Sequence, residues 1–242
     1  MAIWNPWRGC HRVSDGCRFC FIHEGDKKRK QNTSIIEKTT HFSAPIKKKK
    51  QGIYKMKGPQ QVFVCFSSDF FVEAADAWRP ECWKMIKERS DLNFFFLTKR
   101  IHRFEEVIPP DWGDGYENVS IGVSVENQQM VDQRLAYFQS LPIKHKSIAC
   151  QPLLGPVKLA AYLTGIELVV VGGEYHQKAR PLDYQWILDV REECIASQIA
   201  FEFRQCGTHF VKDGQNYQLN YRQLFSQAKK AAINWYPGNN EL

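Results

Sequence analysis

Short apolar runs alternate with longer amphipathic segments along most of this chain. The runs are rich in β-branched and aromatic residues, as buried strands are. Between them, apolar residues recur at helical spacing. The predicted strands lie near residues 62–67, 93–98, 119–125, 146–150, 167–171 and 199–204, and the predicted helices over 76–89, 128–140 and 183–196. Strands that alternate with helices predict βαβ units and a mainly parallel sheet.

This alternation predicts an α/β fold of the barrel type. The uninterrupted apolar run at residues 94–97 suits a strand that is covered on both faces. Six strand–helix units, with a short strand before Cys10, favour a partial or full (β/α) TIM-like barrel. We expect residues 1–242 to form a single domain, since the chain is long enough for one large core. A segment at about 24–60 differs in composition, and we interpret it as a basic insertion.

Composition and charge narrow the class of protein further. Hydrophobic residues make up 43% and charged residues 24%, which is typical of a globular protein. No run approaches the roughly 20 apolar residues that span a bilayer, so we expect no membrane partner. The N-terminus lacks the pattern of a signal peptide, which predicts a cytoplasmic location. The net charge of +7 admits a nucleic acid partner for segment 27–57, although lysine runs are more often solvated loops.

Three of the eight cysteines lie in one eleven-residue window, at Cys10, Cys17 and Cys20. Cys17 and Cys20 can point both sulfurs at one metal, and the loop between Gly9 and Gly16 can bring Cys10 to join them. Thiolate is the ligand that selects iron–sulfur clusters or zinc. Structural zinc sites close with four protein ligands, whereas three thiolates leave one position open for chemistry. The histidines at positions 11 and 23 could complete a zinc site, so both metals remain candidates.

Polar or glycine residues follow each apolar run, where the active sites of βα barrels are built. The alternative is that these residues only cap the helices that follow. Glu126 and Glu174 are candidates for an acid/base pair or for ribose contacts. Cys206 is a candidate hydrogen-atom donor or a small buried residue. The remaining strand-end candidates are Ser68, Asp69, Thr98, Lys99, Arg100, Ser124, Gln151, Gly172 and Gly173.

Several motifs occur in one order over about residues 4–207. They are Trp4-Asn5-Pro6-x-x-Gly9-Cys10, Cys17-x-x-Cys20, Ser68-Asp69-Phe70, Leu97-Thr98-Lys99-Arg100, Gly122-Val123-Ser124-Val125-Glu126-Asn127, Pro152-Leu153-Leu154-Gly155-Pro156 and Val171-Gly172-Gly173-Glu174. Together they resemble the phage-associated radical-SAM-like proteins of unassigned function. The sequence departs from the usual radical SAM pattern in two ways: six residues separate the first two cysteines, and Gly-Gly-Glu follows the sixth predicted strand.

The resemblance implies a partial TIM-like barrel with a 4Fe–4S cluster on Cys10, Cys17 and Cys20. The open iron would bind S-adenosylmethionine (SAM), and a flavodoxin or ferredoxin would supply the electron that cleaves it. Phe19 would lie by the adenine, and Asp69 would contact the methionine amine. Other residues that would contact SAM are Ser68, Thr98, Lys99, Ser124, Glu126, Gln151, Gly172 and Gly173.

We therefore expect a radical SAM-type enzyme that abstracts hydrogen from an unknown substrate, with nucleic acid or nucleotide as the leading candidate. One alternative is a zinc-stabilised nucleic-acid-binding protein without catalysis. Another is an iron–sulfur protein that has lost catalysis. The sequence leaves the oligomeric state open.

Overall fold

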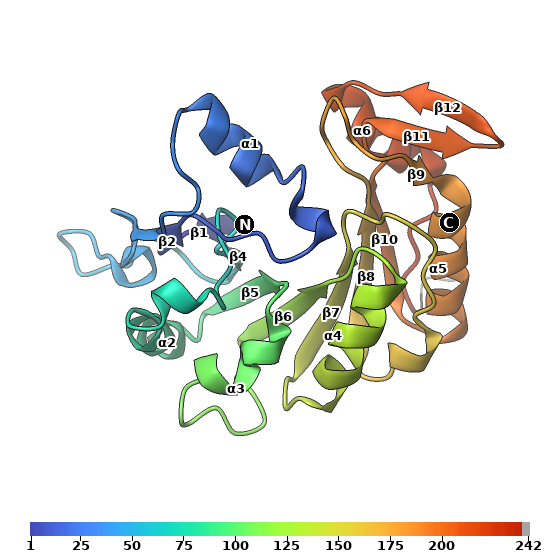
Figure 1. Ribbon diagram of the computed structural model, residues 1–242. Helices are drawn as coiled ribbons and strands as arrows, with labels where there is room; N and C mark the ends of the chain where they lie inside the picture. The colour runs from blue at the N-terminus through green and yellow to red at the C-terminus, as the bar shows by residue number, and fades with distance from the viewer. Residues whose placement is uncertain (239–242) are drawn as a thin grey trace. The chain divides into compact units, whose positions relative to one another are not determined.

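The computed structural model describes residues 1–238, which divide into two compact units (Figure 1). Unit 1 comprises Met1–Val13, Ile22–Gly122 and Pro142–His145. Within the described residues, unit 2 comprises Ser14–Phe21, Val123–Leu141 and 146–238. The clustered cysteines are divided between the units, because Cys10 belongs to unit 1 whereas Cys17 and Cys20 belong to unit 2.

Unit 1 is built around parallel strands. Strand β1 pairs with β4, and β4 pairs with β5, both in parallel, while β2 and β3 form an antiparallel pair. Its strands are β1 (Ala2–Trp4), β2 (Trp7–Arg8), β3 (Glu37–Lys38), β4 (Gln60–Val64) and β5 (Leu92–Thr98). Its helices are α1 (Phe21–Lys28), α2 (Arg79–Glu88) and α3 (Phe104–Val107), with the short 3-10 helices η2 (Ala44–Ile46), η3 (Glu73–Ala75) and η4 (Ile101–Arg103).

Unit 2 has the same strand–helix alternation. Strand β8 pairs in parallel with both β7 and β10, and a small second sheet has the order β12-β11-β9. Its strands are β7 (His145–Cys150), β8 (Ile166–Gly172), β9 (Leu182–Asp183), β10 (Ala200–Gln205), β11 (His209–Lys212) and β12 (Gln215–Gln218). Its helices are η1 (Asp15–Cys17), α4 (Gln128–Ser140), η5 (Ala160–Tyr162), α5 (Tyr184–Ala196) and α6 (Tyr221–Ala231). Both α5 and α6 contact β10 (Figure 1).

The main sheet has seven strands in the order β1-β4-β5-β6-β7-β8-β10, where β6 is Val119–Ser124. This order confirms the predicted α/β fold with mainly parallel strands. Over residues 1–238, β1 and β10 are the edge strands and do not pair with each other. The full, closed barrel is therefore wrong for this chain. Of the two predicted forms, the strand order agrees with the partial barrel.

Local chemistry explains where the element boundaries differ from the predicted ones. Strand β4 ends at Val64, three residues before the predicted end, because Cys65 has a positive φ of 57° that a strand cannot continue through. Helix α2 begins at Arg79 rather than at residue 76, and Pro80 occupies its first turn, where proline needs no backbone donor. Helix α6, which was not predicted, begins with a capping box between Asn220 and Gln223.

Each unit buries its own apolar side chains. In unit 1, Phe70 stacks on Trp7 with ring centroids 5.2 Å apart and contacts Trp83 and Phe96 at 5.2 and 4.4 Å. Unit 2 buries the inward faces of β8 and α5, and Cys194 on α5 is fully buried. Burial of a large apolar side chain stabilises a fold by about 1.5–3 kcal/mol, so these clusters hold the strand ends in place.

Within residues 1–238, no helix combines the length and the apolar character that crossing a membrane requires.

Candidate functional site

The tryptophan-rich N-terminal motif fixes Cys10 beside the carboxyl end of β4 in unit 1. The indole of Trp7 donates a hydrogen bond to the carbonyl of Asp69 at 3.2 Å, and the Asn5 side chain accepts one from the amide of Ser67 at 3.1 Å. Gly9 has a φ of 88°, and a Cβ there would lie 2.2 Å from the Ile35 carbonyl oxygen, so only glycine fits. The motif is therefore structural, and it sets the position of the cysteine that follows.

Asp69 and the residues after β5 form one buried network in unit 1. The carboxylate of Asp69 accepts hydrogen bonds from the Thr98 hydroxyl at 2.8 Å and from the Lys99 amide at 3.2 Å. It also forms a salt bridge with Arg100 at 2.9 Å, and both side chains are nearly buried. Ser68, the neighbour of Asp69, donates its hydroxyl to the carbonyl of Gly9. Asp69 therefore orients Arg100, while its expected contact with the SAM amine stays a prediction.

Arg100 also contacts the cysteine segment, residues 10–20, partly through the same nitrogen that binds Asp69. One nitrogen lies 3.8 Å from the Cys10 sulfur, and another donates to the His11 carbonyl at 2.7 Å. Burial lowers the pKa of Arg100, but the charges of Asp69 and Cys10 outweigh burial and raise it above its usual value. The Cys10 sulfur lies 3.5 Å from the same His11 carbonyl, so the guanidinium and the thiol share this acceptor.

In unit 2, Glu126 holds the segment that leads into Cys17. Glu126 is fully buried, and its carboxylate accepts from the Gly16 amide at 3.3 Å and from Arg134 at 3.1 Å. Arg134 also donates to the carbonyl of Ser124, at the end of β6. A carboxylate with these partners fixes the loop before Cys17, and the acid/base and ribose-contact roles of Glu126 stay predictions.

Glu174 repeats this arrangement at the end of β8. Its carboxylate accepts from the backbone amide and the Nε of Arg180 at 2.9 and 3.0 Å. Arg180 in turn forms a salt bridge with Asp15 at 2.7 Å and donates to the Asp15 carbonyl at 2.9 Å. The hydrogen bond to Glu174, opposed by burial, raises the pKa of Arg180. The Arg180 guanidinium also lies 5.8 Å from the Phe19 ring, so this network extends to the residue before Cys20.

The glycines after β8 are required by close packing in unit 2. A Cβ on Gly173 would lie 2.8 Å from the carbonyl oxygen of Cys206, and a Cβ on Gly172 would lie 3.1 Å from the side chain of Gln151. Gln151 therefore packs over Gly172, and the Gly-Gly pair lets neighbouring strand ends approach each other. Their expected SAM contacts stay predictions.

Cys206 is buried at the end of β10, and burial raises the pKa of its thiol to about 12. It therefore stays protonated at neutral pH and is not activated as a thiolate. This state suits either a packing role or the predicted hydrogen-atom donor, because both keep the S–H bond.

The clustered three cysteines differ in burial, since Cys17 is buried whereas Cys10 and Cys20 are partly exposed. Within residues 1–238, no three His, Cys, Asp or Glu side chains are gathered in a metal-binding arrangement. Because Cys10 lies in one unit and Cys17 and Cys20 in the other, their joining at one centre stays a prediction from their spacing.

Sequence reasoning missed two of the arginines that pair with strand-end carboxylates. Arg134 lies on α4 between Val131 and Leu135, and an arginine on an apolar helical stripe indicates a buried partner. That signal could have identified Arg134. Arg180 lies in the loop after β8, where no periodicity marks it.

The fold and these contacts define an α/β protein in which polar networks at strand ends hold an N-terminal cysteine segment. Over residues 1–239 the sequence matches the family described as "Protein of unknown function (DUF5131)". The chain belongs to this DUF5131 family. Comparison with curated proteins and with solved structures found no match.

Proposed function

We propose that this protein is a radical SAM-type enzyme in which Cys10, Cys17 and Cys20 bind a 4Fe–4S cluster. The observation that carries the proposal is that three strand-end carboxylates, each paired with an arginine, hold the cysteine segment. In unit 1, the pair Asp69–Arg100 contacts Cys10 and His11. In unit 2, the carboxylate of the pair Glu126–Arg134 contacts Gly16, and the arginine of the pair Glu174–Arg180 contacts Asp15.

In each unit, the surroundings of the clustered cysteines fit a metal centre bound by thiolates. Cys10 belongs to unit 1, and Cys17 and Cys20 belong to unit 2. Arg100 places a positive charge beside the sulfur of Cys10, and a charge of this kind favours a thiolate. In unit 2, the Ser14 hydroxyl is buried without a hydrogen-bond partner in the described part of the chain. A buried hydroxyl of this kind costs about 1–3 kcal/mol unless a further polar group satisfies it, so this loop suits an additional polar ligand.

Cys10, Cys17 and Cys20 would hold a 4Fe–4S cluster that, when bound and reduced by a flavodoxin or ferredoxin, would supply the electron for reductive cleavage of SAM and so for hydrogen abstraction from a substrate. The residues of this chain have positioning tasks. Arg100 places its charge beside Cys10, Glu126 fixes the amide of Gly16, and Arg180 joins Asp15 to Glu174. Cys206 keeps its hydrogen because burial raises the pKa of its thiol.

Zinc is the alternative metal, and His11 is one of its candidate fourth ligands. The Nε2 atom of His11 contacts the Ser34 carbonyl at 2.9 Å, and zinc ligation through that atom would give this contact up. Ligation through the other ring nitrogen, Nδ1, would keep this contact, which is of the kind that orients a metal-bound histidine, so zinc remains the alternative metal.

Anaerobic reconstitution with iron and sulfide tests the proposal. We expect a brown protein with about four irons per chain, which forms 5′-deoxyadenosine when SAM and dithionite are added. A colourless protein with one zinc would support the non-catalytic nucleic-acid-binding alternative. A loaded cluster without 5′-deoxyadenosine would support an iron–sulfur protein that has lost catalysis.

We also propose that the basic segment 27–57 contacts a nucleic acid substrate. Residues 47–57 form a hairpin in which the Lys49 amide donates to Ile53 and the Lys55 amide donates to Lys47, both at 2.8 Å. The buried guanidinium of Arg89 donates to the Met56 carbonyl at 2.7 Å. The lysines are therefore carried on a hydrogen-bonded hairpin, and no acidic residue occurs from position 38 to position 68.

Replacing the four lysines at positions 47–50 with glutamine is expected to weaken nucleic acid binding and its salt dependence. Each lost phosphate contact lowers the slope of log affinity against log salt by about 0.7 on single strands, so the slope should fall by up to roughly 3. Fluorescence anisotropy in a salt series measures it. Lys87→Gln, which removes an exposed lysine paired with Asp111, is the control. An unchanged slope in the fourfold variant would remove the hairpin from the interface.

A further inference from the structure

Three exposed aromatic rings in unit 2 form a continuous surface, which we call the aromatic ledge: Tyr175, Tyr221 and Phe225. The centroids of Tyr175 and Tyr221 are 5.2 Å apart at an interplanar angle of 60°, and those of Tyr221 and Phe225 are 5.7 Å apart at 73°. The rings are 51%, 59% and 45% exposed. Large apolar side chains that gather in this way on a surface typically mark a binding site.

The helix that carries two of these rings does not need them for its packing. Leu224 and Ala228 are the buried residues of α6, which packs on β10. Tyr221 and Phe225 are four residues apart and lie on a second, exposed face. The ledge is therefore an additional apolar face of α6, extended by Tyr175 from the loop after β8.

Positive charge accompanies the ledge on the same segments. Arg222 follows Tyr221, and Lys229 lies one helical turn beyond Phe225. Lys178 follows Tyr175 in the loop after β8. No acidic residue occurs from position 214 to position 240, or from position 175 to position 182. This combination of open rings and cations without carboxylates complements a strand of bases and phosphates.

Next to the ledge lies a cavity of about 390 Å³, within the size range of small-ligand sites. Phe225 lines it together with Arg204, Lys229, Asn234 and one carboxylate, Glu202, which accepts a hydrogen bond from the Tyr236 hydroxyl at 2.8 Å. The end of the ledge therefore opens onto a cavity that offers an aromatic ring, an amide and two cations beside that carboxylate, and the first three kinds of group recognise nucleotides.

The loop that carries Tyr175 also contacts the cysteine segment of unit 2. The next residue, His176, stacks on Phe19 with ring centroids 4.4 Å apart and an interplanar angle of 10°. Tyr175 directly follows Glu174, whose partner Arg180 binds Asp15. One short loop thus links the ledge to the residues proposed to support the cluster.

We propose that the aromatic ledge binds the unpaired bases of a single-stranded nucleic acid by stacking, while Arg222, Lys178 and Lys229 contact its phosphates. The ledge would thus bind the substrate of the proposed enzyme as a single-stranded nucleic acid. Only the chemistry that follows binding rests on the proposed function. Exposed rings stack on any base, so the expected preference is for single strands over duplexes rather than for one sequence.

Binding of a labelled oligothymidine of about 16 nucleotides, compared with a duplex of equal length, tests this inference by fluorescence anisotropy. We expect the reconstituted protein to prefer the single strand. Tyr221→Leu and Phe225→Leu keep an apolar side chain but remove the ring, and each should weaken single-strand binding roughly 5- to 150-fold. Duplex binding should not change. Arg222→Gln should lower the salt slope by about 0.7.

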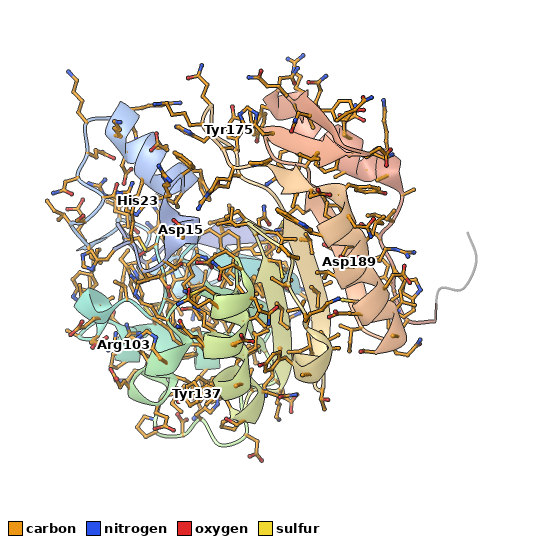
Figure 2. The ribbon with its side chains drawn as sticks, turned by 45° about the vertical axis from the view of Figure 1, so that its right-hand side comes forward. Asp15, His23, Arg103, Tyr137, Tyr175 and Asp189 are labelled. Atoms are coloured by element: carbon orange, nitrogen blue, oxygen red, sulfur yellow. The ribbon has the colours of Figure 1, made fainter. Side chains whose placement is uncertain are left out.

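Tyr137→Leu is the matched control, because it removes a tyrosine of unit 2 that Figure 2 places at the bottom of the view, whereas Tyr175 is at the top. Equal affinity for duplex and single strand would overturn the inference, as would leucine variants that bind oligothymidine like the wild type. Self-association or binding to anionic vesicles that the leucine variants weaken, without oligonucleotide binding, would assign the ledge to another partner. Iron content and 5′-deoxyadenosine formation without substrate, measured on the same variants, show separately whether the cluster proposal holds.

Discussion

Serine in place of Cys10, Cys17 or Cys20 is expected to abolish loading of the iron–sulfur cluster. A serine hydroxyl is a hard, protonated group at neutral pH, whereas cluster iron is held by thiolate. Iron after anaerobic reconstitution should fall from about four per chain to well below one. Iron and acid-labile sulfide analysis, together with the visible absorbance, measures this loss.

Cys194→Ala is the matched control for these substitutions. Cys194 is fully buried on α5, and burial raises the pKa of its thiol to about 12, so it does not offer a thiolate at neutral pH. The control should load iron like the wild type. Full loading of the Cys17 and Cys20 variants would show that the ligands were assigned wrongly. Loss of iron in the Cys194 variant as well would show that the substitutions act by unfolding the protein.

Glu126→Ala is expected to destabilise the protein by about 3–5 kcal/mol, because it leaves the buried guanidinium of Arg134 without its carboxylate. It also removes the acceptor of the Gly16 amide, so the segment before Cys17 should become more susceptible to proteolysis. Urea denaturation measures the loss in the free energy of unfolding. Because the carboxylate and guanidinium balance each other, the double variant Glu126→Leu with Arg134→Met should recover much of it.

Glu117→Ala is the control for this experiment, since it removes one partner of an exposed ion pair with Lys144 and should change stability little. The same variants separate the two roles of Glu126. A catalytic carboxylate would give Glu126→Gln an intact fold and cluster but no substrate turnover. A positioning carboxylate would give losses of stability and of cluster loading that are repaired together in the double variant.

The three carboxylate–arginine pairs, Asp69–Arg100, Glu126–Arg134 and Glu174–Arg180, have the same arrangement. In each pair the carboxylate follows a strand, so the sheet fixes its position, and the arginine is bidentate or nearly buried. Arginine suits this task because its planar fork can bind a carboxylate and a second acceptor at once. The cysteine segment is therefore held by side chains whose own orientation is fixed, as a metal-binding loop requires.

The sequence by itself determined the elements that depend on local periodicity. The strands β5, β6, β7, β8 and β10 and the helices α4 and α5 lie where apolar runs and stripes predicted them, because burial of one face needs a repeat that is visible along the chain. The strand-end residues Asp69, Glu126 and Glu174 were also identified, since parallel strands end at one edge of a sheet.

Only the tertiary structure decided what these strand-end residues do. Arg100 contacts Cys10 across 90 positions, the amide of Gly16 contacts Glu126 across 110, and Arg180 contacts Asp15 across 165. No local pattern encodes such pairings, because they depend on which strand ends become neighbours when the sheet assembles. The sequence thus identified the carboxylates, and the fold assigned each of them an arginine and a place on the cysteine segment.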